Sequence, residues 1–419
     1  MRLTPPRDPV TLTFDGDAVP ASRGEPVAAA LVAAGKITLA RSSKFHRPRG
    51  PACFRGACDG CLARVDDRPN VMTCLVPAED GMVIQSQNTL GSRKVDLLRV
   101  TDWFFPDGMN HHELFAGVPG VQQVMQIFAR RVAGLGRLPK EVTSPRRASR
   151  RNADVVVVGA GPSGMAIATA LAKRGREVEV IDDALVVGGG TTALVGDEAG
   201  AWSAIHEAFA RSGARLRIGA TAGGFYGDDL LVVGGEGAEV LSARAFVLAP
   251  GAHDGVLAFD GNDLPGVMSA RAAGWLLARG VIAGERVVIV VAEGGGPFGE
   301  AFARAAAAMK APCEVTLVHG VPMRARGASR VKEAIVATAS GEVTHDADVL
   351  LVDAPRAPAY ELCAQAGAEL SHEPRGFVVR TIGGKIHDHI WALGEVVGTP
   401  FDVARISAEA EEVAVDISK

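Results

Sequence analysis

Four of the six cysteines lie close together in the first quarter of the chain, at Cys53, Cys58, Cys61 and Cys74. The first three have the C-x4-C-x2-C spacing of a plant-type [2Fe-2S] loop, and a fourth thiolate follows farther along the chain. Small residues within the loop, Gly56, Ala57 and Gly60, allow backbone amides to turn toward the cluster sulfurs. The spacing therefore predicts a [2Fe-2S] cluster held by these four thiolates.

Two other uses of these thiols stay open. Zinc sites usually pair two short C-x2-4-C knuckles, whereas here three thiolates lie in one loop and the fourth stands alone. A redox dithiol of Cys58 and Cys61 would leave Cys53 and Cys74 unexplained. The spacing favours the iron–sulfur cluster over both.

A glycine-rich turn follows four consecutive valines, Val155 to Val158. An apolar run without alternation is typical of a central parallel strand that is buried on both faces. The next strand, Val178 to Ile181, ends at Asp182, where a carboxylate can bind ribose hydroxyls. This order predicts a dinucleotide-binding turn, with its contacts from Gly159, Gly161, Pro162, Ser163 and Gly164.

A second unit of the same kind starts with the apolar run at 286–291, and it has three glycines in GxGxxG register, Gly294, Gly296 and Gly299. The following strand ends at His319 without a ribose-binding acid, and Arg324 and Arg326 lie just beyond it. Because an arginine can take a 2'-phosphate, the unit binds NADP or another phosphorylated adenine nucleotide such as ATP, or it is a degenerate repeat kept as scaffold. The insertion of Ala292-Glu293 favours the scaffold slightly.

The elements around the cysteines predict a β-grasp module. Residues 10–14 alternate as a half-buried strand does, and Asp15-Gly16 is a hairpin turn signal before a second short strand. A short helix follows, with Pro26 at its start and Gly35 at its end. Two strands, a helix and a cysteine loop are the order of a β-grasp ferredoxin.

The stretch KFHRPRGPACFRGACDGCLARVDDRPNVMTCLVPAEDGM resembles the [2Fe-2S] module of heteromeric amino-acid and amine oxidoreductases. This group includes hydrogen cyanide synthase, opine oxidases, and proline and D-hydroxyproline dehydrogenases. The segments at 46–50 and 133–139 also resemble sarcosine oxidase α subunits, in which the cysteines are typically missing. The resemblance implies an α-type subunit with a [2Fe-2S] cluster and FAD, beside a β-type flavoprotein oxidase subunit of the glycine or sarcosine oxidase kind. It leaves open an FMN at the partner interface.

Three later segments resemble two-dinucleotide-domain flavoproteins. The glycines at 188–190, with Gly189 in the middle, resemble the loop that runs under a flavin. The stretch at 245–270 brings Gly251 toward the nucleotide, although Pro250 replaces the usual threonine there. In HIWALGEVVG, Gly394 and Glu395 stand where the family has a glycine and an aspartate that faces the flavin ribityl chain or pyrophosphate.

The expected fold is therefore α/β: an N-terminal β-grasp [2Fe-2S] ferredoxin-like domain, followed by a glutathione-reductase-like Rossmann flavoprotein fold with two dinucleotide-binding domains. The expected boundaries are 1–95 for the β-grasp domain and 96–152 for a connector. A split FAD-binding domain would comprise 153–275 and 385–419, with the second nucleotide-binding domain inserted at 276–384.

Three further predictions concern the connector. Its apolar spacing predicts a helix from Val121 to Val132, and the basic run Arg146 to Arg151 is interpreted as a solvated interdomain linker. His111 and His112 lack a cysteine or carboxylate at ligand spacing, so they are interpreted as surface or core histidines rather than metal ligands.

Composition excludes several classes of function. The formal net charge of −4 and a pI near 6.2 give no reason to expect nucleic acid or an anionic membrane as a partner. No apolar run reaches the ~18 residues of a membrane span, and the N-terminus has no secretory apolar segment. The cysteines are clustered rather than spread as a disulfide framework, so we expect a cytoplasmic protein.

The primary hypothesis is an electron-transferring α-type subunit of a heteromeric, flavin-dependent amino-acid or amine dehydrogenase or oxidase. The substrate, of the sarcosine, proline, hydroxyproline or opine kind, would be oxidised on the partner subunit. One alternative is a self-sufficient NAD(P)H-dependent reductase with FAD and a [2Fe-2S] cluster. Another is a non-catalytic, nucleotide-binding scaffold subunit. No combination of nucleophile, base and orienting group identifies catalytic residues in this chain.

Overall fold

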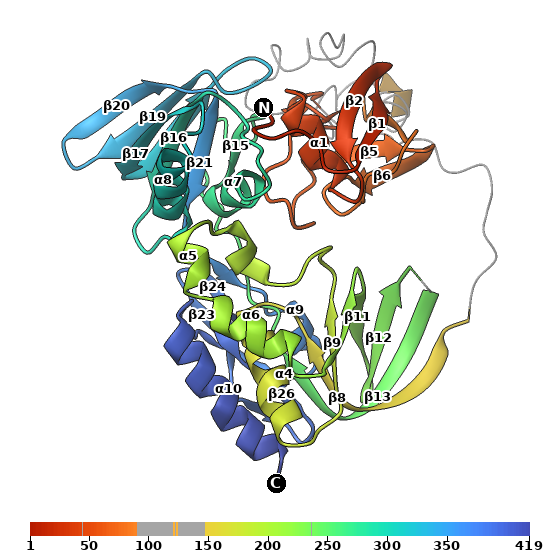
Figure 1. The fold of residues 1–419 in the computed structure, drawn as a ribbon. Coiled ribbons are helices and arrows are strands. Elements are labelled where there is room, and N and C mark those ends of the chain that lie inside the picture. Colours follow the sequence, from red (N-terminus) through yellow and green to blue (C-terminus); the bar gives the residue numbers. More distant parts are fainter. Residues whose placement is uncertain (44, 90–119, 122, 125–146, 236) are drawn as a thin grey trace. The chain divides into compact units, whose positions relative to one another are not determined.

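The computed structural model describes residues 1–43, 45–89, 120–121, 123–124, 147–235 and 237–419. The chain forms two compact units (Figure 1). Unit 1 comprises Met1–Val142, Leu257–Val291 and Ala306–Val352, and unit 2 comprises Thr143–Val256, Ala292–Ala305 and Asp353–Lys419. In the described ranges, none of the helices has the length and apolar character that a membrane crossing requires.

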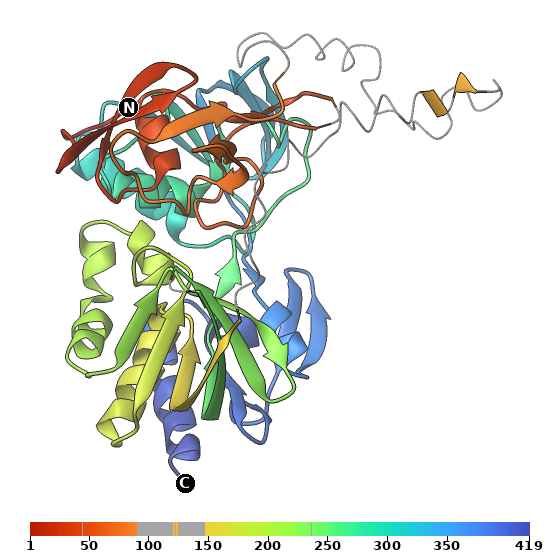
Figure 2. The same ribbon diagram turned by 90° about the vertical axis from the view of Figure 1, so that its right-hand side faces the viewer.

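The N-terminal part of unit 1 is a five-stranded sheet with the order β2-β1-β7-β5-β6. Its strands are drawn in red and orange in Figure 2. Strands β1 and β2 form the predicted hairpin, and β7 returns parallel to β1. Leu12 and Phe14 of β1 are fully buried, as the alternating pattern predicts. The elements are β1 (Pro9–Phe14), β2 (Asp17–Ser22), α1 (Val27–Ala33), β3 (Ala40–Arg41), β4 (Pro48–Arg49), β5 (Leu62–Val65), β6 (Arg68–Met72) and β7 (Val83–Ser86).

The rest of unit 1 is a four-stranded sheet, β15-β21-β16-β17, and a three-stranded antiparallel sheet, β18-β19-β20. The apolar run at 286–291 forms β16, which lies parallel to β17. The elements are β15 (Val267–Ser269), α7 (Ala270–Leu277), β16 (Arg286–Val291), β17 (Glu314–His319), β18 (Val321–Arg326), β19 (Glu333–Thr338), β20 (Gly341–Asp346) and β21 (Val349–Asp353). Helix α8 (Phe298–Ala308) runs from unit 2 into unit 1.

Unit 2 contains an eight-stranded sheet with a parallel part in the order β10-β9-β8-β13-β26. The four valines form the end of β8, between β9 and β13. The elements before residue 260 are β8 (Ser149–Val158), α4 (Pro162–Lys173), β9 (Val178–Asp182), η2 (Gly189–Ala193), α5 (Asp197–Gly200), α6 (Ser203–Ala210), β10 (Arg215–Ile218), β11 (Thr221–Tyr226), β12 (Asp229–Gly234), β13 (Gly237–Leu248) and β14 (Ala252–His253).

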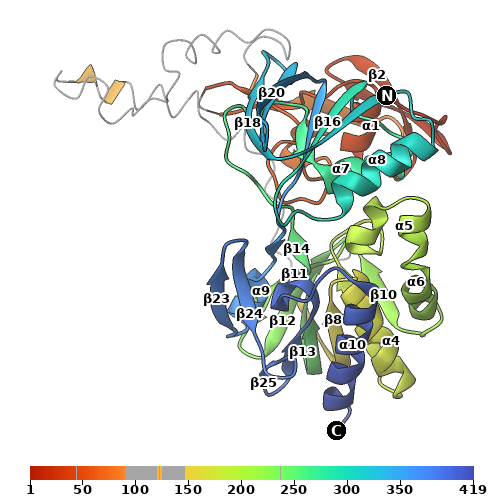
Figure 3. The ribbon, with the colours of Figure 1, turned by 90° about the vertical axis from the view of Figure 1, so that its left-hand side faces the viewer.

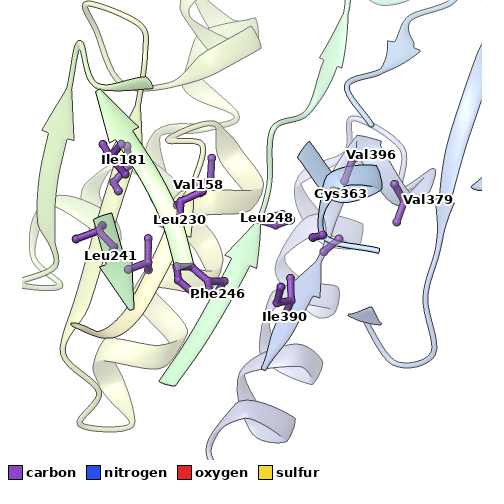
Figure 4. Close-up of a cluster of buried hydrophobic side chains, with 14 of the residues drawn as sticks. Val158, Ile181, Leu230, Leu241, Phe246, Leu248, Cys363, Val379, Ile390 and Val396 are labelled. Atoms are coloured by element: carbon purple, nitrogen blue, oxygen red, sulfur yellow. The ribbon is translucent and has the colours of Figure 1, made fainter. Parts of the chain in front are cut away.

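The C-terminal part of the chain completes unit 2. Helix α10 packs beside α4 (Figure 3). The elements are β22 (Ala357–Pro358), α9 (Glu361–Gln365), β23 (Glu369–Glu373), β24 (Gly376–Arg380), β25 (Lys385–His387), β26 (Ile390–Ala392), η3 (Gly394–Val397) and α10 (Val403–Ile417). Phe246, Leu248, Ile390, Cys363 and Val396 meet in a buried cluster between the sheet and these late elements (Figure 4).

The compact units divide the chain at other points than the boundaries expected from sequence. Residues 257–275, expected in the FAD-binding domain, lie in unit 1, where β15 pairs with β21. Residues 353–384, expected in the inserted domain, lie in unit 2. Strand β26 pairs with β13, so the last part of the chain does return to the first parallel sheet.

The basic run Arg146 to Arg151 is interpreted from sequence as a solvated linker, but its last three residues, Ser149–Arg151, begin β8, in which Ser149 and Arg150 are exposed and Arg151 is half-buried. Arg151 pairs with Glu179 and Glu239 at 2.9 Å each, and Arg217 pairs with the same two carboxylates at 2.9 and 2.6 Å. The Glu179 side chain is only 7% exposed. Four parallel strands, β8, β9, β10 and β13, bring these charges together.

The remaining predictions for the connector fall outside the described residues. His111, His112 and the segment at 133–139 lie there, as does the helix predicted from Val121 to Val132 apart from residues 121, 123 and 124. These predictions stay untested.

We expect Arg151→Ala to lower the free energy of unfolding by about 2 kcal/mol, because it removes one cation from a partly buried cluster of charges. The matched control is Arg150→Ala. Its side chain is 75% exposed and pairs with Asp229 alone among the described carboxylates, so we expect a loss of no more than about 0.5 kcal/mol. Urea unfolding of the three proteins measures both differences. Equal losses would contradict a stabilising role for the cluster.

Candidate functional site

The first glycine turn connects the end of β8 to α4 in unit 2. Gly159 has a φ of +104°, and a Cβ atom built on it would lie 2.2 Å from the carbonyl oxygen of Ala249. A Cβ atom on Gly164 would lie 1.8 Å from the carbonyl oxygen of Gly159. Both positions exclude a side chain because protein backbone already fills that space. Because Gly159 and Gly164 have no side chains, the start of α4 can pack directly on the end of the central strand, β8.

Gly161 differs from these two glycines. Its φ is −75°, and the nearest atom to a Cβ built on it is the Cα of Gly189, at 3.9 Å. The packing of the protein therefore does not require a glycine at this position. The fingerprint predicts a dinucleotide pyrophosphate here, and the absence of a close backbone contact beside Gly161 is compatible with the approach of such a group.

Asp182 lies at the end of β9, as the sequence predicts. One of its carboxylate oxygens accepts a hydrogen bond from the Ala160 amide at 2.5 Å, and the other accepts one from the Ala184 amide at 2.8 Å. The side chain therefore fixes the glycine turn directly. A carboxylate has about four lone-pair sites, so these bonds are compatible with a further contact to a ribose hydroxyl.

The late flavoprotein segment also reaches this turn. A Cβ atom on Gly394 would lie 2.4 Å from Oγ of Ser163, so η3 packs directly on the start of α4. The Gly394 amide donates to Glu409 at 2.9 Å, and the hydroxyl of Thr399 donates to the other oxygen of the same carboxylate at 2.8 Å. Burial raises the pKa of Glu409. The Gly394 amide is thus used within the protein.

Glu395 forms an ion pair that the sequence did not reveal. Nη1 of Arg356 lies 2.8 Å from both of its carboxylate oxygens, and Nη2 donates to the carbonyl of Ala252 at 2.9 Å. The side chains of Arg356 and Glu395 are 10% and 17% exposed. A Cβ atom on Gly251 would lie 3.8 Å from the same carboxylate. The predicted residues Gly251 and Glu395 therefore do come together, and Arg356 joins the segment after Gly251 to η3.

Aromatic side chains line the loop at 188–190. A Cβ atom on Gly190 would lie 3.1 Å from the ring of Phe401. A Cβ atom on Gly189 would lie 3.0 Å from the Cα of Gly161. The ring centroid of Phe401 lies 4.5 Å from that of Trp202 and 5.7 Å from that of Phe298. None of these aromatic residues was predicted, because they come from three separate segments.

The second glycine turn has a different environment. Gly294 has a φ of +71°, while the amides of Gly296 and Gly299 donate to the carboxylate of Asp353 at 3.0 and 2.6 Å. Asp353 is buried at the end of β21. No sequence pattern predicts this contact, since the acid lies more than fifty residues after the turn.

In unit 1, the four predicted thiols form two close pairs. The sulfur atoms of Cys61 and Cys74 lie 3.4 Å apart, and the thiol of Cys53 is hydrogen-bonded to Cys58. Cys53, Cys61 and Cys74 are buried. In a [2Fe-2S] cluster bound by four cysteines, each iron takes two thiolates, so the paired arrangement suits that group. Over the described ranges, no set of three or more His, Cys, Asp and Glu side chains gathers around one metal-ion position.

Backbone amides turn toward these sulfurs, as predicted. The hydrogen bond from Cys61 and burial raise the pKa of Cys74, and the Gly56 amide acts against this increase. The amides of Ala57 and Gly60 likewise favour the thiolate form at Cys53 and Cys58. The hydrogen bond from Cys53 lowers the pKa of Cys58 to about 6, and that same bond raises the pKa of Cys53. Metal ions bind thiolates, so a loop that stabilises them is suited to a cluster.

The cysteine loop also contacts residues about two hundred positions later in the sequence. Arg271 of α7 is 5% exposed and donates to the carbonyl of Cys53. The ring of Phe54 stacks on Trp275 with centroids 5.6 Å apart, and the guanidinium of Arg279 lies 3.6 Å from the Trp275 ring centroid. A buried cation beside the loop would favour the reduced form of a cluster and raise its reduction potential.

Two family models match the chain. Residues 7–89 match a 2Fe-2S iron-sulfur cluster binding domain, and this range includes all four predicted thiol ligands. Residues 153–329 match a pyridine nucleotide-disulphide oxidoreductase domain, and this range includes both glycine turns. The matches confirm the expected fold class, an N-terminal [2Fe-2S] domain followed by a Rossmann flavoprotein fold.

Related proteins agree with this assignment. The chain is 28% identical to sarcosine oxidase subunit alpha of Rhizobium meliloti (strain 1021), over 63% of this chain and 30% of that protein. It is 26% identical to the same subunit of Corynebacterium sp. (strain P-1), over 67% and 28%. The chain thus covers less than a third of these relatives.

A solved structure has the same overall architecture. L-proline dehydrogenase from P. horikoshii superimposes with a TM-score of 0.72 at 20% identity, and the match covers all of this chain and 75% of that one. At this identity the likeness shows the fold. The two domains and the named relatives together confirm the resemblance inferred from the motifs: this chain is similar to the α-type subunits of [2Fe-2S] flavoprotein amine oxidoreductases.

Proposed function

We propose that this chain is the electron-transferring α-type subunit of a heteromeric, flavin-dependent dehydrogenase or oxidase that acts on an amino acid or amine. The observation that carries the proposal is the pairing of the four thiols, Cys53 with Cys58 and Cys61 with Cys74, in a chain that also has an open glycine turn. A flavin supplies two-electron chemistry, and a [2Fe-2S] cluster passes on electrons singly.

The cluster would be held in unit 1. Cys53 and Cys58 would bind one iron and Cys61 and Cys74 the other, because the thiols are already close in these pairs. The amides of the loop would stabilise the thiolates, and Arg271 would add positive charge near Cys53.

A dinucleotide, for which we propose FAD, would be held in unit 2. The space beside Gly161 would take the pyrophosphate, with Pro162, Ser163 and the first turn of α4 next to it. Asp182 would contact the ribose. Arg356 neutralises Glu395, which removes a source of repulsion between that carboxylate and an anionic ligand.

Oxidation of the substrate would occur on a partner subunit of the β-type flavoprotein oxidase kind. This part of the proposal rests on the relatives, which are named as the alpha subunits of sarcosine oxidase. Among the described residues of this chain, we find no arrangement that would oxidise an amine. We propose a substrate of the sarcosine or proline kind, because the sequence relatives are sarcosine oxidase subunits and the structural neighbour is an L-proline dehydrogenase.

Spectroscopy of the purified protein tests the proposal. The chain alone should contain about two iron atoms and two sulfides, and a flavin that resists NAD(P)H. With a glycine-oxidase-like partner added, the amino acid or amine should bleach the flavin and then the cluster. Bleaching by NAD(P)H without the partner would support the self-sufficient reductase instead. A colourless protein, with neither iron nor flavin, would support the scaffold.

Substitution of two neighbouring glycines should separate ligand binding from packing. We expect Gly161→Val to leave the urea unfolding curve nearly unchanged, because its Cβ atom would make an ordinary contact with the Cα of Gly189 at 3.9 Å. It should abolish the co-purifying dinucleotide, because the side chain fills the place where the pyrophosphate would lie. Gly164→Ala should lower the unfolding free energy by about 1–3 kcal/mol, because its Cβ atom meets the Gly159 carbonyl. Chromatography of acid extracts measures the nucleotide. Full occupancy in Gly161→Val would contradict the assignment.

Cys58→Ser should abolish the visible absorption of the cluster and reduce the iron content while leaving the dinucleotide bound, because the thiols and the glycine turn lie in different units. Cys313→Ser is the matched control, since this half-buried thiol is not one of the four paired thiols. The absorbance spectrum, iron analysis and nucleotide analysis of the same samples give the result. Loss of the nucleotide together with the cluster would contradict independent binding.

A further inference from the structure

The second glycine turn closes on a carboxylate of its own chain. The amide of Gly296 donates to one oxygen of Asp353 at 3.0 Å, and the amide of Gly299 donates to the other at 2.6 Å. These amides lie at the start of α8, where a dinucleotide-binding domain presents its donors to a pyrophosphate. In this chain Asp353 already accepts both bonds.

The position of Asp353 is fixed by the backbone as well as by its side chain. Its carbonyl oxygen accepts a hydrogen bond from the Ala292 amide at 3.0 Å. A Cβ atom on Gly295 would lie 2.4 Å from the same carbonyl, so the turn and the end of β21 are in direct contact. Asp353 is only 4% exposed. The carboxylate is therefore held in the turn rather than resting there by chance.

The charge of Asp353 opposes an anionic ligand. Burial raises the pKa of its carboxyl group to about 6, so the group is ionised at pH 8. A pyrophosphate that approached the same amides would meet a like charge at hydrogen-bond range and would find both donors used. At the first turn the carboxylate of Asp182 takes the Ala160 amide, which precedes α4, while the nearest atom to a Cβ on Gly161 is a backbone carbon at 3.9 Å.

The two arginines considered for a 2'-phosphate are also paired. Arg324 lies 2.8 Å from Asp260, and Arg326 lies 3.5 Å from Glu333. Both pairs are well exposed, and exposed pairs contribute little energy, so a ligand could break them. The inference therefore rests on Asp353.

We infer that Asp353 takes the place of a dinucleotide phosphate, and that the second glycine turn binds neither NAD nor NADP. The turn then serves the fold, with Asp353 capping α8. Electrons would not enter this chain from NAD(P)H through that turn, which argues against the self-sufficient reductase. The inference does not depend on which nucleotide the first turn binds.

Equilibrium dialysis of the full chain with NADPH and with NADH at pH 8 tests the inference. The Gly161→Val substitution is included in every sample so that the first turn does not contribute. We expect no saturable binding while Asp353 is present. Saturable binding of either nucleotide to this chain would overturn the inference.

Two further substitutions in the same background probe the turn directly, with inorganic pyrophosphate as the ligand. Asp353→Ala frees both amides, so pyrophosphate should bind at least about tenfold tighter than to the parent chain. Asp353→Asn keeps the size of the side chain, removes its charge and leaves one acceptor oxygen, so it should give a smaller gain. Pyrophosphate binding that is unchanged in both folded variants would overturn the inference. If the alanine variant does not fold, the asparagine variant and the dialysis of the parent chain decide the question.

Discussion

The close contact between the end of β8 and the start of α4 is the constraint on which unit 2 depends. The carbonyl of Gly159 lies where a side chain on Gly164 would have to fit, so the helix packs on the strand without an intervening side chain. Asp182 then holds the Ala160 amide, and Gly394 packs on Ser163. A turn held from these sides keeps the helix amides in one place, which a phosphate-binding site requires.

The two glycine turns have the same spacing but different surroundings. A Cβ atom on Gly161 would make only an ordinary contact, 3.9 Å from the Cα of Gly189, whereas the amides of Gly296 and Gly299 donate to a buried aspartate. A helix N-terminus attracts any anion, whether this is a ligand phosphate or a carboxylate of the same chain. The structure therefore favours an open site at the first turn and a closed one at the second. The electrons that we propose reach the cluster would then come from the dinucleotide proposed for the first glycine turn.

The cysteine loop combines local and distant contributions. Its own amides act on the sulfurs, and this follows from small residues at fixed spacing. The buried guanidinium of Arg271 and the stacking of Phe54 on Trp275 come from α7, far along the sequence. Such groups adjust charge and solvent access around a redox centre rather than bind it.

Features that depend on neighbouring residues could be predicted from the amino-acid order alone. Spacing and periodicity act within one segment. They therefore predicted the grouping of the four cysteine thiols, the first glycine turn, the buried valine strand of β8 and the strand at 286–291. The pairing of distant charges became known from the folded chain: Arg151 with Glu179 and Glu239, Arg356 with Glu395, and Asp353 with the second turn. Crossover connections and strand register bring these side chains together. The residue spacing within one segment predicts neither the connections nor the register.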